Sequence, residues 1–346
     1  MNQKSISKII FERRSSKNCV FFGANSALNT YKQQNTTGGN NMIISIDHGN
    51  KQIKTHNRTF TSGLYESDSK PAFGEDVLCF NGKYYALSEE RIPYMRDKTK
   101  DSRFFILTLF AIAYEIEAAG KYTPDSTIDI KLNVGLPPSH YSGLYEKYES
   151  YFMGPRRPIS FTFRGKPYSI FISEVNSYPQ AYSAAMTVYG MIRDLPRAFV
   201  VDIGGFTADY LLLKKGVADL SVCDSLEHGV ILLYNAIKSK VNADFDLLID
   251  ESDIDSILKG EQHGFSEEIT KITEKMAKSF VDQLFGKLRE RMIDLRVGKT
   301  IFIGGGSILL RKYIESSDKV SGCIIIDDIA ANEKGYDLLY RADHRR

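Results

Sequence analysis

The chain of 346 residues lacks most features that mark metal-binding, secreted or nucleic-acid-binding proteins. Its four cysteines include no CxxC pair, and this spacing argues against a zinc site or a disulfide framework and suits a reducing cytosol. The formal net charge is only +2, so no basic field argues for direct contact with DNA. What remains is an ordinary globular composition, in a chain long enough to form two lobes.

Long hydrophobic segments are missing as well. The longest apolar run, residues 104–119, is interrupted by Glu115 and Glu117, and it is short for a bilayer span of ~20 residues. We therefore expect it to be a buried helix. The first residues also lack an apolar segment of signal-peptide length. Together these absences predict a cytoplasmic protein that does not contact a membrane.

Residues 1–41 differ in composition from the rest. Asn, Ser, Thr, Gly and basic residues dominate, as in the run 33–41. This composition predicts a disordered N-terminal tail. A basic helix lying on a membrane surface is the less favoured alternative.

Two later segments repeat one pattern, an apolar strand that ends in Asp, then glycine, then a second strand. Residues 42–54 contain Asp47 followed by Gly49, and residues 199–213 contain Asp202 followed by Gly204. Glycine lets backbone N–H groups approach a phosphate closely, and the acid can hold a hydrated Mg²⁺. Two copies predict a fold with two related halves, although each could be a simple hairpin.

A third glycine element and a connecting segment complete the set. Residues 299–307 form an apolar strand followed by three glycines and Ser307, and a helix is predicted from Ile308. A helix N-terminus behind glycines suits a phosphate or nucleoside, or is only a flexible turn. Residues 177–186 are predicted as a helix with Gln180 in its first turn, either near a cleft or exposed to solvent.

These motifs together resemble the actin/Hsp70/sugar-kinase superfamily and, within it, the ParM (StbA) plasmid-segregation actins. The resemblance runs from Met42 to about residue 340. It implies an α/β, actin-like (ribonuclease H-like), duplicated two-lobed fold with a nucleotide cleft between the lobes. The domains it implies are 42–195 with an insertion at about 59–95, 196–327 with a helical subdomain at about 229–297, and a C-terminal helix in 328–346 that returns to the first domain.

The resemblance also implies roles for particular residues. Asp47 and Asp202 would hold Mg²⁺ through water, and Gln180 would align the attacking water. The ParM branch often has Glu at the Gln position, so Glu174 is the alternative. Asp209 is expected to face solvent, and the small-molecule kinase alternative would instead use it as the base against a substrate hydroxyl. The residues implied to bind nucleotide are Asp47, Gly49, Asn50, Lys51, Asp202, Gly204, Gly205, Phe206, Thr207, Lys238, Gly304, Gly305, Gly306 and Ser307.

The function implied is a filament-forming ATPase that uses ATP, or GTP, with Mg²⁺. Such a protein assembles with itself into a polar filament and moves plasmid DNA through a DNA-binding adaptor protein. Two alternatives stay open at this point. One is a small-molecule kinase or a non-polymerising ATP-binding regulator of the same superfamily, and the other is a non-enzymatic scaffold.

Overall fold

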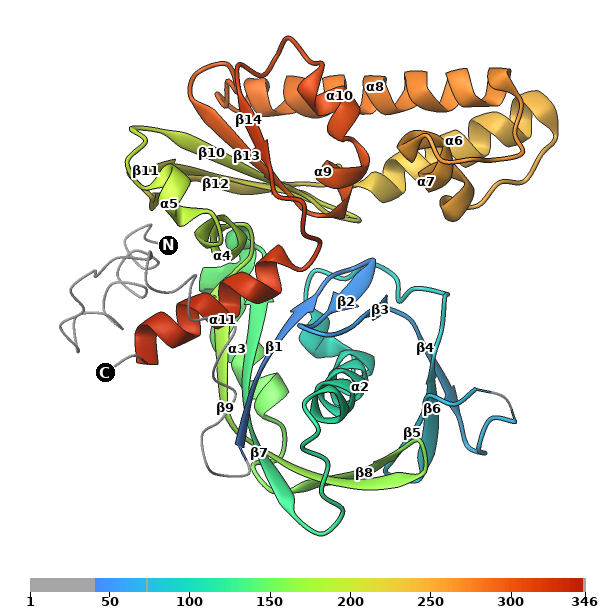
Figure 1. Cartoon of the computed structure of the whole chain (residues 1–346), viewed down its shortest axis with the longest axis vertical. Helices are drawn as coiled ribbons and strands as arrows, with labels where there is room; N and C mark the ends of the chain where they lie inside the picture. The colour runs from blue at the N-terminus through green and yellow to red at the C-terminus, as the bar shows by residue number, and fades with distance from the viewer. Residues whose placement is uncertain (1–40, 73, 345–346) are drawn as a thin grey trace. The chain divides into compact units, whose positions relative to one another are not determined.

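The computed structural model describes residues 41–344 apart from Phe73 (Figure 1). The predicted N-terminal tail lies outside the described residues, except for Asn41, which begins the first strand. The described chain forms two compact units. Unit 1 holds the residues up to Gly190 and those from Ala330 onward, and unit 2 holds Met191–Ile329.

Unit 1 is built on a nine-stranded mixed sheet in the order β3-β2-β1-β7-β9-β8-β5-β6-β4. Three parallel strands, β1, β7 and β9, lie next to one another, and antiparallel strands extend the sheet on both sides. The strands are β1 (Asn41–His48), β2 (Gln52–Lys54), β3 (Thr59–Thr61), β4 (Leu64–Ser67), β5 (Val77–Phe80), β6 (Lys83–Leu87), β7 (Thr127–Leu136), β8 (Ile159–Phe163) and β9 (Lys166–Pro179). The helices are η2 (Lys98–Lys100), α2 (Arg103–Ala118), α3 (Pro138–Met153), α4 (Tyr182–Met186) and α11 (Ala331–His344).

The apolar run at 104–119 forms α2, as predicted. Nearly every side chain from Phe104 to Ile116 is buried, and Figure 1 shows the sheet of unit 1 curving around this helix. A helix that is apolar on all sides is stable only when it is enclosed in this way. Glu115 is tolerated there because its carboxylate accepts hydrogen bonds from Thr55 and from the backbone and side chain of Asn57.

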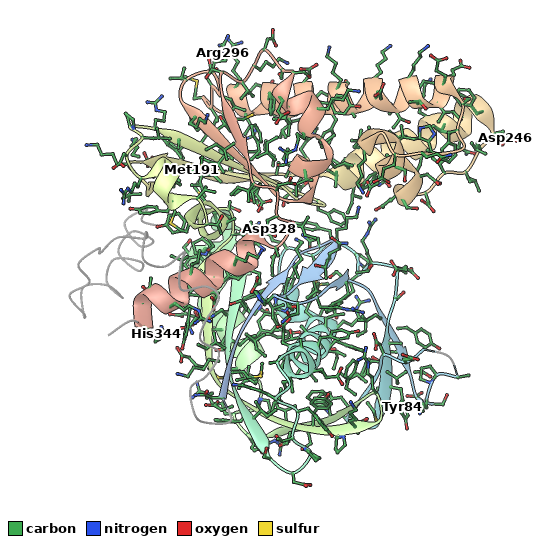
Figure 2. All side chains as sticks on the ribbon, viewed as in Figure 1. Tyr84, Met191, Asp246, Arg296, Asp328 and His344 are labelled. Carbon is green, nitrogen blue, oxygen red and sulfur yellow. The ribbon has the colours of Figure 1, made fainter. Side chains whose placement is uncertain are left out.

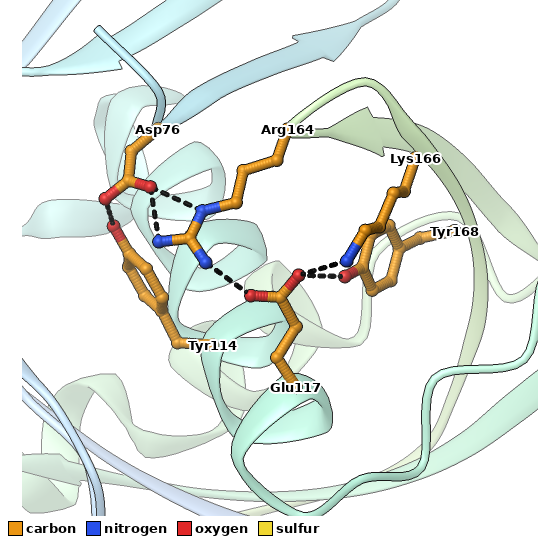
Figure 3. Close-up of polar contacts among 6 residues, drawn as sticks. All are labelled: Asp76, Tyr114, Glu117, Arg164, Lys166 and Tyr168. Carbon is orange, nitrogen blue, oxygen red and sulfur yellow. Dashed lines mark hydrogen bonds and ion pairs between the residues drawn. The ribbon is translucent and has the colours of Figure 1, made fainter.

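A second polar cluster fastens the same, C-terminal end of α2 to the sheet (Figure 3). Arg164, in the turn between β8 and β9, pairs with Asp76 at 2.6 Å and with Glu117 at 2.7 Å. The same Glu117 carboxylate accepts a hydrogen bond from the Tyr168 hydroxyl at 3.1 Å, and Asp76 accepts one from Tyr114 at 2.6 Å. Each carboxylate therefore has at least two donors, which secures a loop, a helix end and a hairpin together.

Unit 2 has a five-stranded sheet in the order β12-β11-β10-β13-β14. Its strands are β10 (Ala198–Ile203), β11 (Ala208–Lys214), β12 (Val217–Leu226), β13 (Lys299–Ile303) and β14 (Cys323–Ile325). Its helices are α6 (Val230–Phe245), α7 (Glu251–Lys259), α8 (Glu267–Glu290), α9 (Gly305–Leu309) and α10 (Arg311–Glu315), while α5 (Tyr189–Ile192) spans the boundary between the units. Within this unit, α6, α7 and part of α8 extend beyond one edge of the sheet (Figure 1).

The two predicted hairpins are present, one in each unit. β1 pairs antiparallel with β2 and parallel with β7. β10 likewise pairs antiparallel with β11 and parallel with β13. The two units thus repeat one local topology, which confirms the duplicated arrangement that the sequence pattern predicted.

Glycine allows α11 to approach its neighbours in unit 1 closely. A Cβ added at Gly335 of α11 would lie 2.0 Å from the Ser183 carbonyl oxygen in α4. A Cβ added at Gly135 of β7 would lie 1.9 Å from the Tyr336 hydroxyl oxygen. Both distances are far inside van der Waals contact, so the packing requires glycine at both positions, against the α4 backbone at Gly335 and against the Tyr336 side chain at Gly135.

We predict opposite effects of alanine at two glycines that both lie inside helices. A Cβ added at Gly286 of α8 has no atom within 4 Å. Gly286→Ala should therefore raise the free energy of unfolding by up to ~1 kcal/mol, because alanine is the better helix former. Gly335→Ala should lower the free energy of unfolding by ~1–3 kcal/mol, because the added methyl group collides with the backbone of α4. Urea unfolding of both variants measures the difference, and a stabilising Gly335→Ala would contradict the close packing described here.

Candidate functional site

Asp47, one residue before the end of β1, is one of the most enclosed carboxylates of unit 1. Its side chain is only 2% exposed, and both of its oxygens are engaged. Lys54 Nζ lies 3.1 Å from Oδ2, and Gln180 Nε2 donates to Oδ1 at 2.8 Å. The antiparallel pairing of Asp47 with Lys54 brings these two residues side by side on the β1–β2 hairpin.

The charge state of Asp47 follows from this environment. Burial by itself raises the pKa of the carboxyl, but the Lys54 ammonium, the Lys98 charge and the Gln180 hydrogen bond together hold the pKa below its usual value. Asp47 is therefore a carboxylate at neutral pH, in a place where a neutral acid would otherwise be favoured.

The turn after Asp47 accepts only glycine at its first bend. A Cβ at Gly49 would lie 2.5 Å from the Gln52 carbonyl oxygen. Asn50 and Lys51, two of the predicted binding residues, complete this turn and are half-buried. Lys54 of β2 pairs with Asp47, and its side chain is only 15% exposed.

His48 anchors the end of β1 in the core of unit 1, a role that the sequence did not indicate. Its ring is fully buried and stacks on Phe152 of α3 with ring centroids 4.5 Å apart. Its Nε2 lies 2.8 Å from Thr108 Oγ1, and Lys98 donates to its carbonyl oxygen. Two helices and η2 therefore fix the backbone on the C-terminal side of Asp47.

The predicted helix at 177–186 is wrong in its first part. β9 continues to Pro179, paired in register with Leu136, and the Gln180 N–H donates to the Leu136 carbonyl at 2.8 Å. Ala181 then takes a positive φ of 59°, and its N–H donates to Asn332 of α11 at 2.9 Å. Strand pairing with β7 has overridden the helix-start preference of Pro179, and the kink directs the Gln180 amide to Asp47.

Glu174 lies elsewhere. It is six residues before Gln180 on β9, a separation of roughly 20 Å along an extended strand. Its carboxylate contacts Lys131 at 3.5 Å and His344 at 3.4 Å. The structure brings Gln180, and not Glu174, to the side chain of Asp47.

In unit 2, the turn at 204–207 is held from one side by α6. The N–H groups of Gly229, Val230 and Ile231 donate to the carbonyls of Phe206, Gly204 and Gly205 at 3.0, 3.1 and 2.9 Å. Gly229 fits between them because a Cβ there would lie 2.3 Å from the Gly205 oxygen. The first N–H groups of a helix need partners outside it, and here the turn supplies them.

The hydrogen bonds from α6 also fix the direction of the N–H groups in the 204–207 turn. In a trans peptide, the N–H of one residue points opposite to the C=O of the residue before it. Because the three carbonyls point to α6, the N–H groups of Gly205, Phe206 and Thr207 point away from it. Successive N–H groups directed to one side form a concave anion-binding surface.

Asp202 and the three glycines after β13 adjoin this turn. Asp202 is 7% exposed. Gly304 has a φ of +87°, and a Cβ there would lie 2.3 Å from Asp202 Oδ1. A Cβ at Gly306 would lie 2.6 Å from the side chain of Ile203, whereas nothing lies within 4 Å of one at Gly305. Gly304 and Gly306 are therefore packing positions, and Gly305 is the open one.

Two further predicted binding residues have local partners. The Ser307 hydroxyl is buried and donates to the Ile303 carbonyl at 2.5 Å, which fixes the start of α9. Lys238 of α6 lies 3.9 Å from Glu251 of α7. The structure thus gathers Asp202, the 204–207 turn and Gly304 closely, while Lys238 lies further along α6.

The expectation that Asp209 faces solvent is wrong. Asp209 is 5% exposed and is paired with Asp202 across β10 and β11. It accepts hydrogen bonds from Ser225 and, at 3.4 Å, from Thr207. Burial raises the pKa of the Asp209 carboxyl to about 7, and the Asp202 charge adds to the rise. The β-strand alternation could have placed Asp209 beside Asp202, because cross-strand partners share one face.

Two features are absent from the part of the chain that the structure describes. Across residues 41–72 and 74–344, no three His, Cys, Asp or Glu side chains gather as a metal site. In the same residues, no helix combines the length and apolar character needed to cross a membrane.

Comparison with known domains gives two matches, one in each unit. Residues 45–182 match the N-terminal domain of actin-like proteins. Residues 200–316 match the C-terminal domain of the archaeal MreB-like actin homologue. No curated protein sequence matches the chain.

Solved structures of similar fold agree with these matches. The archaeal actin homologue Ta0583 has a TM-score of 0.67 at 18% identity, over 87% of this chain and 99% of its own. A ParM from a 15-stranded filament of Clostridium botulinum has a TM-score of 0.65 at 17% identity, over 85% and 97%. Bacillus thuringiensis ParM with ATP has a TM-score of 0.62 at 13% identity, over 88% and 100%. The chain therefore has the two-lobed, ParM-like actin fold, and each of its two units matches a domain of actin-like proteins.

The burial of His48 gives a prediction about pH. Burial and the Lys98 charge lower the pKa of His48 to about 3, against ~6.5 in an unfolded chain. Between these values the unfolded chain binds a proton that the folded chain does not, so the free energy of unfolding falls as pH falls, by up to ~1.4 kcal/mol per pH unit.

The variant His48→Gln isolates this effect. The Thr108 hydroxyl donates to the Phe104 carbonyl, so His48 Nε2 must be the donor to Thr108, and a glutamine amide can replace it. Urea unfolding between pH 6.5 and 4.5 should show a weaker pH dependence in the variant than in the wild type. Equal pH dependence in both proteins would show that His48 is protonated in the folded state.

Proposed function

We propose that this protein is a nucleotide-dependent, filament-forming actin-like ATPase. The observation that carries the proposal is the direction of the three N–H groups at 205–207, which face away from α6 and beside Asp202. A nucleotide phosphate is the ligand that suits such a surface. The Bacillus thuringiensis relative is solved with ATP, which supports the choice of nucleotide. GTP is the alternative nucleotide.

Unit 1 would supply the groups around the reacting phosphate. The Asp47 carboxylate fixes the amide of Gln180 through Nε2, which leaves the Gln180 carbonyl oxygen to accept a hydrogen bond from the attacking water. Lys54 neutralises Asp47 and brings a cation to the hairpin. Positioning and charge neutralisation are the main requirements of phosphoryl transfer, so these groups suffice.

The carboxylates of Asp47 and Asp202 fit a divalent cation of the hard, oxygen-binding kind. Both Asp47 oxygens already have donors, so contact through water is the natural mode for that residue, and Mg²⁺ keeps much of its water shell. When bound with the nucleotide, Mg²⁺ would neutralise phosphate charge. Asp47 and Asp202 would accept hydrogen bonds from the water molecules around Mg²⁺ and so fix the position of the ion.

Assembly into a polar filament is the further part of the proposal, supported by the ParM filament among the similar structures. In the cell we place the protein in the cytoplasm, where the filament would move plasmid DNA through a DNA-binding adaptor. The domain limits expected from the sequence, 42–195, 196–327 and 328–346, belong to the same proposal.

Asp202→Ala tests the proposal most simply. The change removes the carboxylate beside the 204–207 turn, so Mg²⁺–ATP binding should weaken by at least about 10-fold, and nucleotide-dependent sedimentation should be lost. Wild-type protein with ATP and Mg²⁺ should pellet and hydrolyse ATP. Wild-type turnover in the variant would remove Asp202 from the site. Turnover that requires an added sugar or acid, without pelleting, would instead favour a small-molecule kinase.

Gly229→Ala tests the part played by α6 without removing any polar group. Its methyl group would collide with the Gly205 oxygen and displace the turn, so ATP affinity should fall at least about 10-fold, the effect of ~1.4 kcal/mol. Gly264→Ala, in the same unit, meets nothing within 4 Å and is the control. Isothermal titration calorimetry compares the two, and equal affinities would show that the turn does not hold the nucleotide.

A further inference from the structure

The connection between α6 and α7, residues 246–250, is here called the acidic loop. Between Lys240 and Lys259 the sequence has six acidic residues and no basic one, namely Asp244, Asp246, Asp250, Glu251, Asp253 and Asp255. Asp250 serves locally as the cap of α7. Asp246 forms no ion pair with any residue in the described part of the chain, and Figure 2 shows it at the outer end of the helical part of unit 2.

The acidic loop also exposes apolar side chains. Leu248 is 86% exposed and Leu247 is 37% exposed. A leucine that exposed contributes little to the stability of its own unit, since its apolar surface stays in water. A surface with exposed leucines bordered by acidic side chains is complementary to a partner site that is apolar and positively charged.

A site of that kind lies on unit 1. A pocket of about 540 Å³ between η2 and the start of α3 is lined by Met95, Arg96, Lys100, His140, Leu144 and neighbouring residues. We call it the cationic groove. Arg96 and Lys100 are exposed. Neither forms an ion pair within residues 41–344 as described. Asp97 also lines the groove, but Lys147 neutralises it at 2.6 Å.

The helix ends reinforce this complementarity. The cationic groove lies at the N-terminus of α3, and the acidic loop follows the C-terminus of α6, and both helices are 16 residues long. A helix carries partial positive charge at its N-terminus and partial negative charge at its C-terminus. On each surface the charge of the helix end agrees with the charge of the side chains. Both are positive at the cationic groove, and both are negative at the acidic loop.

We propose that the acidic loop of one copy of this chain docks in the cationic groove of a second copy. Leu248 would enter the groove against Met95 and Leu144, and Asp246 would face Arg96 and Lys100. The two surfaces differ, so the contact is head-to-tail, and repetition of such a contact extends an assembly without limit unless it closes into a ring. The proposal rests on the proposed filament function and names a contact that would build it.

Two surface variants separate the two sides of the contact. Leu248→Lys places a positive charge in the acidic loop, and Arg96→Glu with Lys100→Glu reverses the groove. Each should raise the critical concentration for sedimentation with ATP and Mg²⁺ at least about 10-fold, as for residues central to an interface, and each should still bind ATP as the wild type does. Val217→Lys, at a side chain 65% exposed in the same unit as Leu248, is the matched control and should assemble normally.

A mixture of the two defective variants distinguishes docking from general loss of assembly. The loop variant keeps its groove and the groove variant keeps its loop, so an equal mixture should form a dimer in analytical ultracentrifugation, while each alone stays monomeric. Normal assembly of both variants would overturn this contact and leave the filament function standing. A mixture that remains monomeric would also overturn the contact. A wild type that never assembles would overturn the filament function and the contact together.

Discussion

Three backbone N–H groups, from Gly229, Val230 and Ile231, donate to the carbonyls of the 204–207 turn. This bonding satisfies donors that any helix start leaves unpaired, and it rotates the turn so that its own N–H groups face the opposite side. The chemistry proposed for unit 2 depends on that orientation. Gly229 permits the contact because no side chain separates the helix from the turn, so one hydrogen atom in place of a methyl group decides the geometry.

In unit 1, side-chain contacts fix the corresponding hairpin. Its β1–β2 hairpin has the same topology as β10–β11, but side chains determine its electrostatics. Lys54 and Gln180 hold the Asp47 carboxylate from two sides, and His48 anchors the following backbone in the core. Kinking at Ala181, whose N–H is held by Asn332, aims Gln180 at Asp47. Residues from β1, β2, the bend after β9 and α11 therefore cooperate at one carboxylate.

The sequence predicted the two hairpins and the buried helix at 104–119, because each depends on local periodicity or on short glycine motifs. The actin-like fold followed from the resemblance of these motifs to a known superfamily. It failed where tertiary pairing decides. Pro179 favours a helix start locally, yet pairing with β7 extends the strand through it. Asp209 was expected to face solvent, but it pairs with Asp202 across β10 and β11 and accepts a hydrogen bond from Ser225 of β12. The bonds from α6 to the 204–207 turn join separate segments, so only the structure reveals them.

The central claim is that the N–H groups of Gly205 and Thr207 bind a nucleotide phosphate. Backbone amide NMR of protein labelled with ¹⁵N-glycine and ¹⁵N-threonine, titrated with Mg²⁺–ATP and separately with adenosine, tests it directly. The account predicts that ATP shifts the amide signals of Gly205 and Thr207, and that adenosine, which has no phosphate, leaves them in place. ATP binding without any change at these two amides would contradict the account.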